Sequence, residues 1–211
     1  GNDAGNYTIG YTNANLVIGK ANLTLSGTRV YDGGKTYAGS YLTATGVNGE
    51  TFAVTGSGDT SNLASKNVQS NSTLSSVTGL SLGGGSNGGL SSNYNALSTT
   101  GSSVSVTAKT ATVTGTATNA TYNGSSQTQN AASTSGFIAN DDITVSGLAS
   151  GTNAATYTSN LAVSGSDVGN YTIGYTNANL VIGKANLTLS GTRVYDGGTT
   201  YAGSYLTAAG V

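Results

Sequence analysis

Short segments of the chain alternate apolar and polar residues with a period of two. Leu23 and Leu25 alternate with polar residues in 22–26, and Val104 and Val106 do so in 103–107. The same alternation recurs at 7–12 (Tyr7, Ile9, Tyr11), 142–146 (Ile143, Val145) and 160–164 (Leu161, Val163). This pattern is typical of half-buried antiparallel strands. No stretch keeps a period of 3.6, so several short strands separated by Gly, Asn and Ser turns predict a β-sandwich.

The apolar face changes phase at lysines that stand at the starts of modules. Before Lys20 the apolar residues are at even positions (Leu16 and Ile18), and after it they are at odd positions. The same change occurs around Lys109, and Lys184 is in the equivalent place. Because no flexible linker intervenes, the last strand of one module is expected to run directly into the next module through a short, stiff junction.

A long repeat organises the chain. Residues 1–47 recur as residues 165–211, an offset of 164, and four of the 47 positions differ: Asn2/Ser166, Ala4/Val168, Lys35/Thr199 and Thr45/Ala209. Such identity indicates a recent tandem duplication and outranks local signals in fold assignment. A weaker repeat relates 16–27 to 104–115, so the long period holds two related modules.

These patterns predict an all-β fold of tandem antiparallel β-sandwich modules. We expect complete modules at 19–107 and 108–183. Residues 1–18 would be the closing strands of a preceding module, and residues 184–211 the opening strands of the next. A parallel β-helix is the main alternative, but it would show a sequence period close to one coil.

Several short motifs resemble known modules. The first module resembles the YDG module of large bacterial surface adhesins through Tyr31-Asp32-Gly33, 64–68, 77–80 and Asn93-Tyr94. The second is similar to the related MBG module through Tyr122-Asn123-Gly124, 145–148, Tyr157, 161–165, 169–171 and 180–182. The resemblance makes 1–18 the end of an MBG-like module and 184–211 the start of a YDG-like one. It implies Ig-like sandwiches in tandem, in filamentous-hemagglutinin-type secreted proteins, and no catalysis.

Composition removes several classes of function. The chain has no Cys or His, so it lacks a thiolate nucleophile, a disulfide, a zinc finger and a histidine base. Charged residues are 7% of the chain and the net charge is −1, which does not suit binding to nucleic-acid phosphates. No apolar run approaches the roughly 18 residues of a membrane span. No signal peptide is present, so we expect any export signal to lie outside this segment.

An acidic pair and a glycine-rich segment are candidate sites. Asp141-Asp142 is an adjacent carboxylate pair, for which we prefer a turn before the strand at Ile143 over a calcium ligand or a catalytic acid. The segment 79–103 is expected to be a flexible surface loop, because glycines such as Gly83-Gly84-Gly85 permit many backbone conformations. A nucleotide-binding loop is the alternative, but neither a P-loop Lys-Ser/Thr nor a helix pattern follows.

Three further motifs have structural and functional interpretations. In Tyr31-Asp32-Gly33 and its copy at 195–197, we expect Tyr to pack and Asp-Gly to turn, rather than to form a ligand-contacting tip. The thirteen Tyr are expected in cores or strand pairs, with sugar stacking as the alternative. An isopeptide bond from Lys20, Lys109 or Lys184 to Asn is considered and not favoured.

The sequence therefore predicts a non-enzymatic structural repeat of an extracellular bacterial adhesin or fibre. Such a repeat would extend a stalk or filament for adhesion or for building a matrix or biofilm. The alternative is a carbohydrate-binding module for exopolysaccharide. We predict no catalytic, metal or cofactor-binding residue and no cofactor. The expected partners are neighbouring copies, either covalently continuous or joined head to tail by residues 184–211 against residues 1–18.

Overall fold

The computed structural model describes residues 2–211 and is built of short strands and single 3-10 turns, which confirms the all-β class. Within that range no helix is longer than three residues. None of these turns has the length and apolar character needed to cross a membrane. The 3-10 turns are η1 (Ala4–Asn6), η2 (Gly39–Tyr41), η3 (Val47–Gly49), η4 (Ser91–Asn93), η5 (Val168–Asn170) and η6 (Gly203–Tyr205).

The chain divides into two compact units. The first contains residues up to Thr28, Lys35–Ala64 and Asn71–Val104. The second contains Arg29–Gly34, Ser65–Ser70 and Ser105–Val211. The loop of the Tyr31-Asp32-Gly33 motif and the segment around Lys66 therefore belong to the second unit, although much of the sequence around them belongs to the first.

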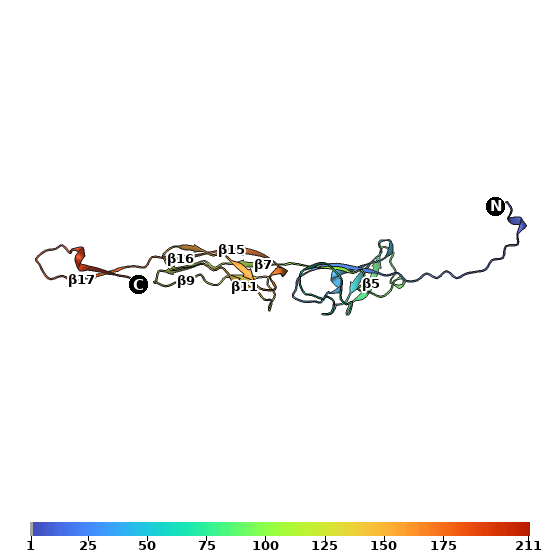
Figure 1. The fold of residues 1–211 in the computed structure, drawn as a ribbon, viewed down its shortest axis with the longest axis horizontal. Helices are drawn as coiled ribbons and strands as arrows, with labels where there is room; N and C mark the ends of the chain where they lie inside the picture. The colour runs from blue at the N-terminus through green and yellow to red at the C-terminus, as the bar shows by residue number, and fades with distance from the viewer. Residues whose placement is uncertain (1) are drawn as a thin grey trace. The chain divides into compact units, whose positions relative to one another are not determined.

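Much of the first unit lies in a six-stranded sheet with the order β4-β6-β1-β2-β3-β5. Its edge strand β5 is labelled in Figure 1. The strands are β1 (Thr24–Val30), β2 (Leu42–Thr45), β3 (Thr51–Thr55), β4 (Gln69–Ser72), β5 (Ser81–Ser86) and β6 (Ser103–Thr107). The pairs β1–β2, β2–β3 and β3–β5 are antiparallel. Alternate residues of these strands are buried, among them Leu25, Leu42, Ala44, Phe52 and Val54. This burial follows the alternation expected from the sequence at Leu25.

The glycine-rich segment predicted as a surface loop contains strand β5. Gly85 lies opposite Phe52 of β3, and a Cβ atom on Gly85 would lie 2.7 Å from the Cε1 atom of the Phe52 ring. The loop prediction is wrong here because glycine, although a weak strand former, allows a close approach to an aromatic ring. Tyr94, which follows η4, packs edge-on against the same ring with centroids 5.0 Å apart.

The second unit is made of several small sheets. Its strands are β7 (Lys109–Thr114), β8 (Thr118–Thr121), β9 (Gln127–Thr128), β10 (Ser133–Ser135), β11 (Thr144–Ser146), β12 (Ser150–Gly151), β13 (Thr156–Thr158), β14 (Ala162–Ser164), β15 (Tyr171–Thr176), β16 (Asn179–Gly183), β17 (Thr188–Gly191) and β18 (Leu206–Ala209). They form the sheets β10-β7-β15, β13-β16-β8, β11-β14, β12-β9 and β17-β18. Ala149, Leu180 and Ile182 form a core cluster, covered by Ala120, Tyr122 and Tyr157.

Two strand pairs of this unit are parallel. β15 runs parallel to β7, with Tyr171 opposite Lys109, and β16 runs parallel to β8, with Leu180 opposite Thr118. The prediction of purely antiparallel sheets is therefore wrong for these pairs. Alternation along a strand reports which face is buried, and it carries no information on the direction of the partner strand.

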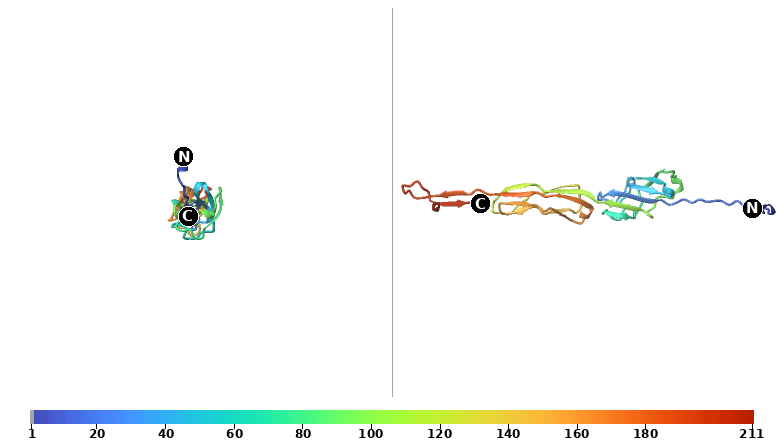
Figure 2. Two further views of the ribbon diagram at one scale, coloured as in Figure 1. Left: turned by 90° about the vertical axis from the view of Figure 1, so that its right-hand side faces the viewer. Right: turned by 90° about the horizontal axis from the view of Figure 1, so that it is seen from above.

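The hairpins and the 3-10 turns of the two repeat copies have the same local structure. β17 pairs with β18 in the register that β1 has with β2: Thr188 lies opposite Ala209 as Thr24 lies opposite Thr45. η6 repeats η2, and η1 repeats η5. Figure 2 shows β17–β18 as a separate hairpin, and no third strand of the described chain joins it.

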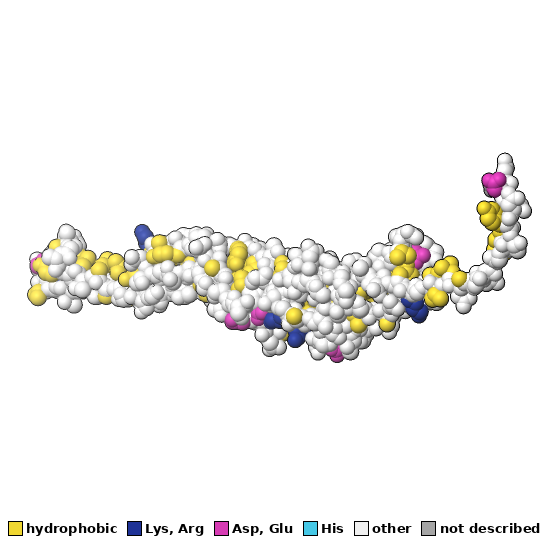
Figure 3. All heavy atoms as spheres, turned by 45° about the vertical axis from the view of Figure 1, so that its right-hand side comes forward, with side chains coloured by type: hydrophobic (Ala, Val, Ile, Leu, Met, Phe, Trp, Pro, Cys, Tyr) yellow, Lys and Arg dark blue, Asp and Glu magenta, His cyan; other side chains and the backbone are white. Residues whose placement is uncertain are grey.

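The two copies differ in the solvent exposure of their equivalent apolar side chains. Leu25 is 1% exposed and its copy Leu189 is 67% exposed. Conversely, Leu180 in β16 is fully buried and its copy Leu16 is 87% exposed. Hydrophobic side chains are correspondingly visible on the surface of both terminal segments (Figure 3). The predicted strands at 7–12 and 16–18 do not form, because no described residue pairs with them, whereas their copies β15 and β16 have partners.

Candidate functional site

The YDG motif forms a turn that is closed by its own side chains. The backbone N–H of Gly34 donates to Asp32 Oδ1 over 2.9 Å, and Gly33 has a φ of 81°, a left-handed value that suits glycine. Arg29 Nη1 pairs with Asp32 Oδ1 at 2.5 Å. Tyr31 is 1% exposed. The motif therefore has the packed Tyr and the Asp-Gly turn of its structural interpretation.

The two other copies of this turn show that it forms locally. At Arg193-Asp196 the ion pair is again 2.5 Å and Gly198 donates to Asp196 over 2.9 Å, although Tyr195 is 89% exposed. At Asn123, an amide oxygen replaces the carboxylate and accepts from the N–H of Ser125 over 3.0 Å. The Asp-to-Asn change thus keeps the geometry of the turn.

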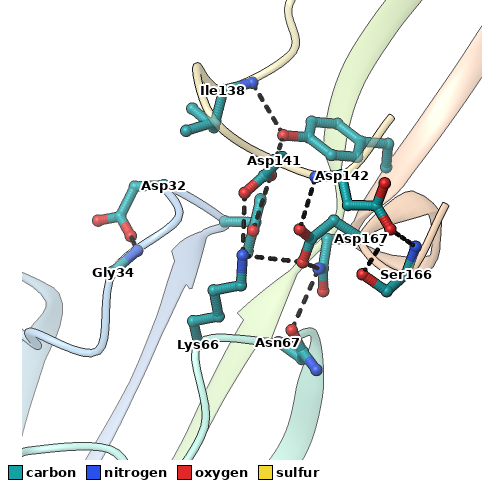
Figure 4. Close-up of polar contacts among 12 residues, drawn as sticks. Asp32, Gly34, Lys66, Asn67, Ile138, Asp141, Asp142, Ser166 and Asp167 are labelled. Atoms are coloured by element: carbon teal, nitrogen blue, oxygen red, sulfur yellow. Dashed lines mark hydrogen bonds and ion pairs between the residues drawn. The ribbon is translucent and has the colours of Figure 1, made fainter. Parts of the chain in front are cut away.

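The buried Tyr31 side chain contacts a polar cluster of the second unit that is centred on Lys66. Lys66 Nζ lies 2.9 Å from Asp141 Oδ1 and 2.8 Å from Asp167 Oδ1 (Figure 4). The Lys66 side chain is 34% exposed, whereas those of Asp141 and Asp167 are 4% and 12% exposed. One ammonium group therefore neutralises two largely buried carboxylates in part, and the three side chains carry a net negative charge.

Two tyrosines complete the shell around Asp141. The Tyr31 hydroxyl donates to Asp141 Oδ2 over 2.8 Å, and the Tyr171 hydroxyl donates to the same oxygen over 2.5 Å. The two rings are edge to face, with centroids 5.5 Å apart, and Phe137 packs against Tyr171 at 4.9 Å. Both oxygens of Asp141 are thus engaged: Oδ1 by the lysine and Oδ2 by the tyrosines.

Further hydrogen bonds connect the three chain segments that carry Lys66, Asp141 and Asp167. Asn170 Nδ2 donates to Asn67 Oδ1 over 3.2 Å, and its Oδ1 accepts from the N–H of Val68 over 2.9 Å. Asp167 Oδ2 accepts from the N–H of Asp142 over 2.9 Å. These bonds join residues 66–68, 137–142 and 167–171 into one cluster, which we call the Lys66 cluster.

Burial and hydrogen bonding shift the pKa values of this cluster. Burial, followed by the hydrogen bond to Asp141, raises the pKa of Tyr171 to about 12, and the same two causes raise the pKa of Tyr31. Burial acts to raise the pKa of Asp141, but hydrogen bonds from Tyr171, Lys66 and Tyr31 outweigh it and hold that pKa below its usual range. Hydrogen bonds to Asp167, Asp141 and Tyr31 raise the pKa of Lys66.

We expect the free energy of unfolding to fall as the pH rises from about 10 to about 12. Tyrosine in the unfolded chain ionises near pH 10, and folded Tyr171 ionises at about 12, so alkali favours the unfolded chain. This contribution to stability is complete below pH 10 and is lost as the pH rises through 12. Tyr171→Phe removes the ionising group, so the free energy of unfolding of this variant should fall less steeply between pH 10 and pH 12 than that of the wild type.

Urea unfolding at a series of alkaline pH values measures this slope. Tyr7→Phe is the matched control, because Tyr7 is the copy of Tyr171 in the repeat and is 75% exposed. The control should keep the wild-type slope. The same slope in Tyr171→Phe as in the wild type would show that Tyr171 is not responsible.

The residues singled out in the sequence are placed as follows. Asp141 and Asp142 lie in a turn before β11, in which the N–H of Asp141 donates to Ile138 O over 3.3 Å. They face different partners, because Asp142 Oδ2 accepts from the N–H and hydroxyl of Ser166. Across residues 2–211, no three acidic side chains are grouped to hold a metal ion.

The lysines singled out in the sequence are not those of the cluster. Lys109 begins β7, and within the described chain Lys66 is the lysine that forms ion pairs, rather than Lys20, Lys109 or Lys184. Sequence reasoning missed Lys66 because its partner Asp141 is 75 residues away. The available signal was weak: Lys66 stands in one of the quoted YDG-like motifs, and Asp141 stands in the adjacent acidic pair.

Comparisons with known proteins bear on the segment that carries Tyr31 and Lys66. No curated protein and no solved structure matches the chain. The model of the YDG domain does match, over a segment that includes β1 to β5 and η4 but not Asp141 or Asp167. A YDG domain is therefore found at residues 18–102.

Proposed function

We propose that the chain is a non-enzymatic structural repeat of a long extracellular protein, of the kind found in bacterial adhesins and fibres. In this proposal, the YDG domain and the strands of 108–183 are Ig-like sandwich modules, the second of them MBG-like. They follow one another in tandem and lengthen a stalk or filament of the filamentous-hemagglutinin type. The role is mechanical: the modules set the reach of the protein and present whatever surface binds a host or a matrix.

The observation that carries the proposal is that equivalent apolar side chains of the two repeat copies are buried in one copy and exposed to solvent in the other. Tyr37 is fully buried in the first unit, and its copy Tyr201 is 43% exposed. Ile182 is 2% exposed in the second unit, and its copy Ile18 is 86% exposed. Since nearly identical segments bury apolar side chains wherever partner strands exist, we take the exposed copies to be parts of modules whose other strands come from further repeats.

The strand pairings of the buried copies support a specific version of this proposal. The copy of 7–19 pairs with β7, β8 and β13, and the copy of 184–211 lies between β6 and β3. The two terminal segments thus resemble strands of different modules. This favours a continuous array, in which each terminal segment is covered by the body of another repeat, over direct contact between residues 184–211 and residues 1–18.

A longer chain tests the array. Residues 48–183 are fused after Val211, so that 184–211 precedes the sequence that follows its copy 20–47. Leu189 should become buried, and Leu189→Ala should then cost about 2–5 kcal/mol, as expected for a core leucine. Electron microscopy of chains with two, three and four repeats should show length rising by a constant step.

Two results would contradict the proposal. Leu189 could remain as tolerant of substitution in the longer chain as in this one, or the longer chains could collapse into particles of unchanged length. A glycan array with the same protein tests the alternative function, the recognition of polysaccharide. Specific binding of a sugar, lost on substitution of exposed tyrosines, would favour the carbohydrate-binding module.

A further inference from the structure

We propose that Lys66 and Asp141 are joined by an intramolecular isopeptide bond, with Asp167 carrying the proton between them. The inference concerns a covalent modification inside the second unit, and it does not rest on the proposed function. It uses the Lys66 cluster, in which Lys66, Asp141 and Asp167 lie outside the strands.

The cluster contains each group that such a bond needs. Lys66 Nζ is the nucleophile, and it lies 2.9 Å from Asp141 Oδ1, on the carboxyl group that would be attacked. Asp167 Oδ1 lies 2.8 Å from the same nitrogen and can accept its proton (Figure 4). Groups held within contact distance react far faster than the same groups in solution, because their encounter has no further entropy cost.

The two tyrosines identify Asp141 as the carboxyl group that reacts. Attack on its carbonyl carbon places negative charge on Oδ2, and the hydroxyls of Tyr31 and Tyr171 already donate to that oxygen over 2.8 and 2.5 Å. Such a pair of fixed donors is the arrangement that stabilises an oxyanion. Among residues 2–211 no tyrosine donates to Asp167, whose Oδ2 accepts from the backbone N–H of Asp142.

The step balances without any further reactant. Asp167 takes one proton from the Lys66 ammonium, and the amine attacks the Asp141 carbonyl carbon. The bond between Nζ and that carbon forms, and the bond between the carbon and Oδ1 breaks. Oδ1 leaves as water with two protons from the lysine nitrogen, one of them delivered by Asp167. No electron is transferred, and Asp167 ends as the carboxylate that it was at the start.

Burial favours the product. The side chain of Asp141 is 4% exposed, and a buried carboxylate is stable only while a cation compensates it. Amide formation replaces this ion pair with a neutral group that still accepts from both tyrosines. Because the ammonium form of Lys66 is favoured at neutral pH, the transfer of its proton to Asp167 is the step that exposes the nucleophile.

The intact mass of the denatured protein tests the proposal. After overnight incubation at neutral pH, the chain should weigh one water molecule less than its sequence requires. Fragmentation of a proteolytic digest should find the segments around Lys66 and Asp141 joined. A full-length mass equal to that of the sequence would overturn the proposal, and so would a bond from Lys66 to Asp167.

Variants separate the roles of the three residues. Lys66→Arg keeps the positive charge and should have the full mass, as should Asp141→Ala. Asp142→Ala is the matched control, because this neighbouring carboxylate faces Ser166, and it should still lose one water. Asp167→Asn keeps both reacting groups and should form the bond at least tenfold more slowly. Bond formation at the wild-type rate in Asp167→Asn would show that Asp167 is not the proton carrier.

Discussion

Leu25→Ala is expected to lower the free energy of unfolding by about 2–5 kcal/mol, and Leu189→Ala to change it by less than about 0.5 kcal/mol. The two leucines occupy equivalent positions of the repeat and have the same neighbours in sequence. They also lie in strands of the same register, opposite Ala44 and Ala208. The two leucines differ in solvent exposure: Leu25 is 1% exposed and Leu189 is 67% exposed.

The size of the difference comes from the core of the first unit. Truncation of a buried leucine loses the transfer free energy of three carbon groups and leaves a cavity that the surrounding strands fill only in part. An exposed leucine has neither term, because water already surrounds it. The difference between the two substitutions therefore measures the contribution of tertiary packing, because strand propensity and local sequence are the same at both positions.

Urea unfolding of the wild type and the two variants gives both values. Hydrogen exchange at the amides of β1 and β17 shows which strand is affected by each change. A cost for Leu189→Ala close to that for Leu25→Ala would mean that the hairpin β17–β18 is covered in solution, and it would contradict the separate hairpin described above.

Asn62→Ala is expected to be of similar severity, about 3–5 kcal/mol, without removing any apolar contact. Asn62 is fully buried and makes four hydrogen bonds to the backbone. Its Oδ1 accepts from the N–H groups of Tyr37 and Asp59, over 3.1 and 2.6 Å. Its Nδ2 donates to the carbonyls of Ser76 and Thr78, over 3.1 and 3.0 Å.

The cost arises because the alanine variant leaves these backbone groups without their partner. An unsatisfied buried donor or acceptor costs about 1–3 kcal/mol, so the loss of four bonds in one place exceeds the loss of a typical one. Asn95→Ala is the control: Asn95 is exposed and its side chain makes one bond, to Asn22, and its loss should cost less than about 1 kcal/mol.

Chemical denaturation of both variants provides the comparison. Asn62→Asp tests the two donated bonds separately, because a carboxylate can still accept from Tyr37 and Asp59 but cannot donate to Ser76 and Thr78. It should be destabilising as well, since it adds a buried charge. Equal stability of the Asn62→Ala and Asn95→Ala variants would show that water replaces the amide at no cost.

Local features of this fold could be predicted from the sequence, and features that depend on distant partners could not. The strands around Leu25, Val104 and Val113 follow from alternation, because a half-buried strand must place apolar residues on one face. The Asp-Gly turn at Asp32 follows from side-chain hydrogen bonding within three residues. Both depend on atoms that are close together in the chain.

The parallel pairs and the Lys66 cluster depend on long-range contacts. Tyr31 reaches Asp141 across 110 positions, and no residue pattern marks that distance. Strand β5 was missed for a different reason, since Gly85 has a low intrinsic preference for strands and gains its place from the approach of Phe52. In each case the deciding interaction is tertiary.

The shared register of the two repeat copies has a consequence for how such a gene can change. Because β1–β2 and β17–β18 pair in the same register, a genetic exchange between residues 24–45 and their copies 188–209 rejoins the chain inside the same hairpin. The product gains or loses 164 residues, and the longer product has a second copy of residues 48–183 after the hairpin. Unequal recombination can therefore lengthen the encoded protein in whole steps of 164 residues without changing the sequence at the point where the two copies are joined.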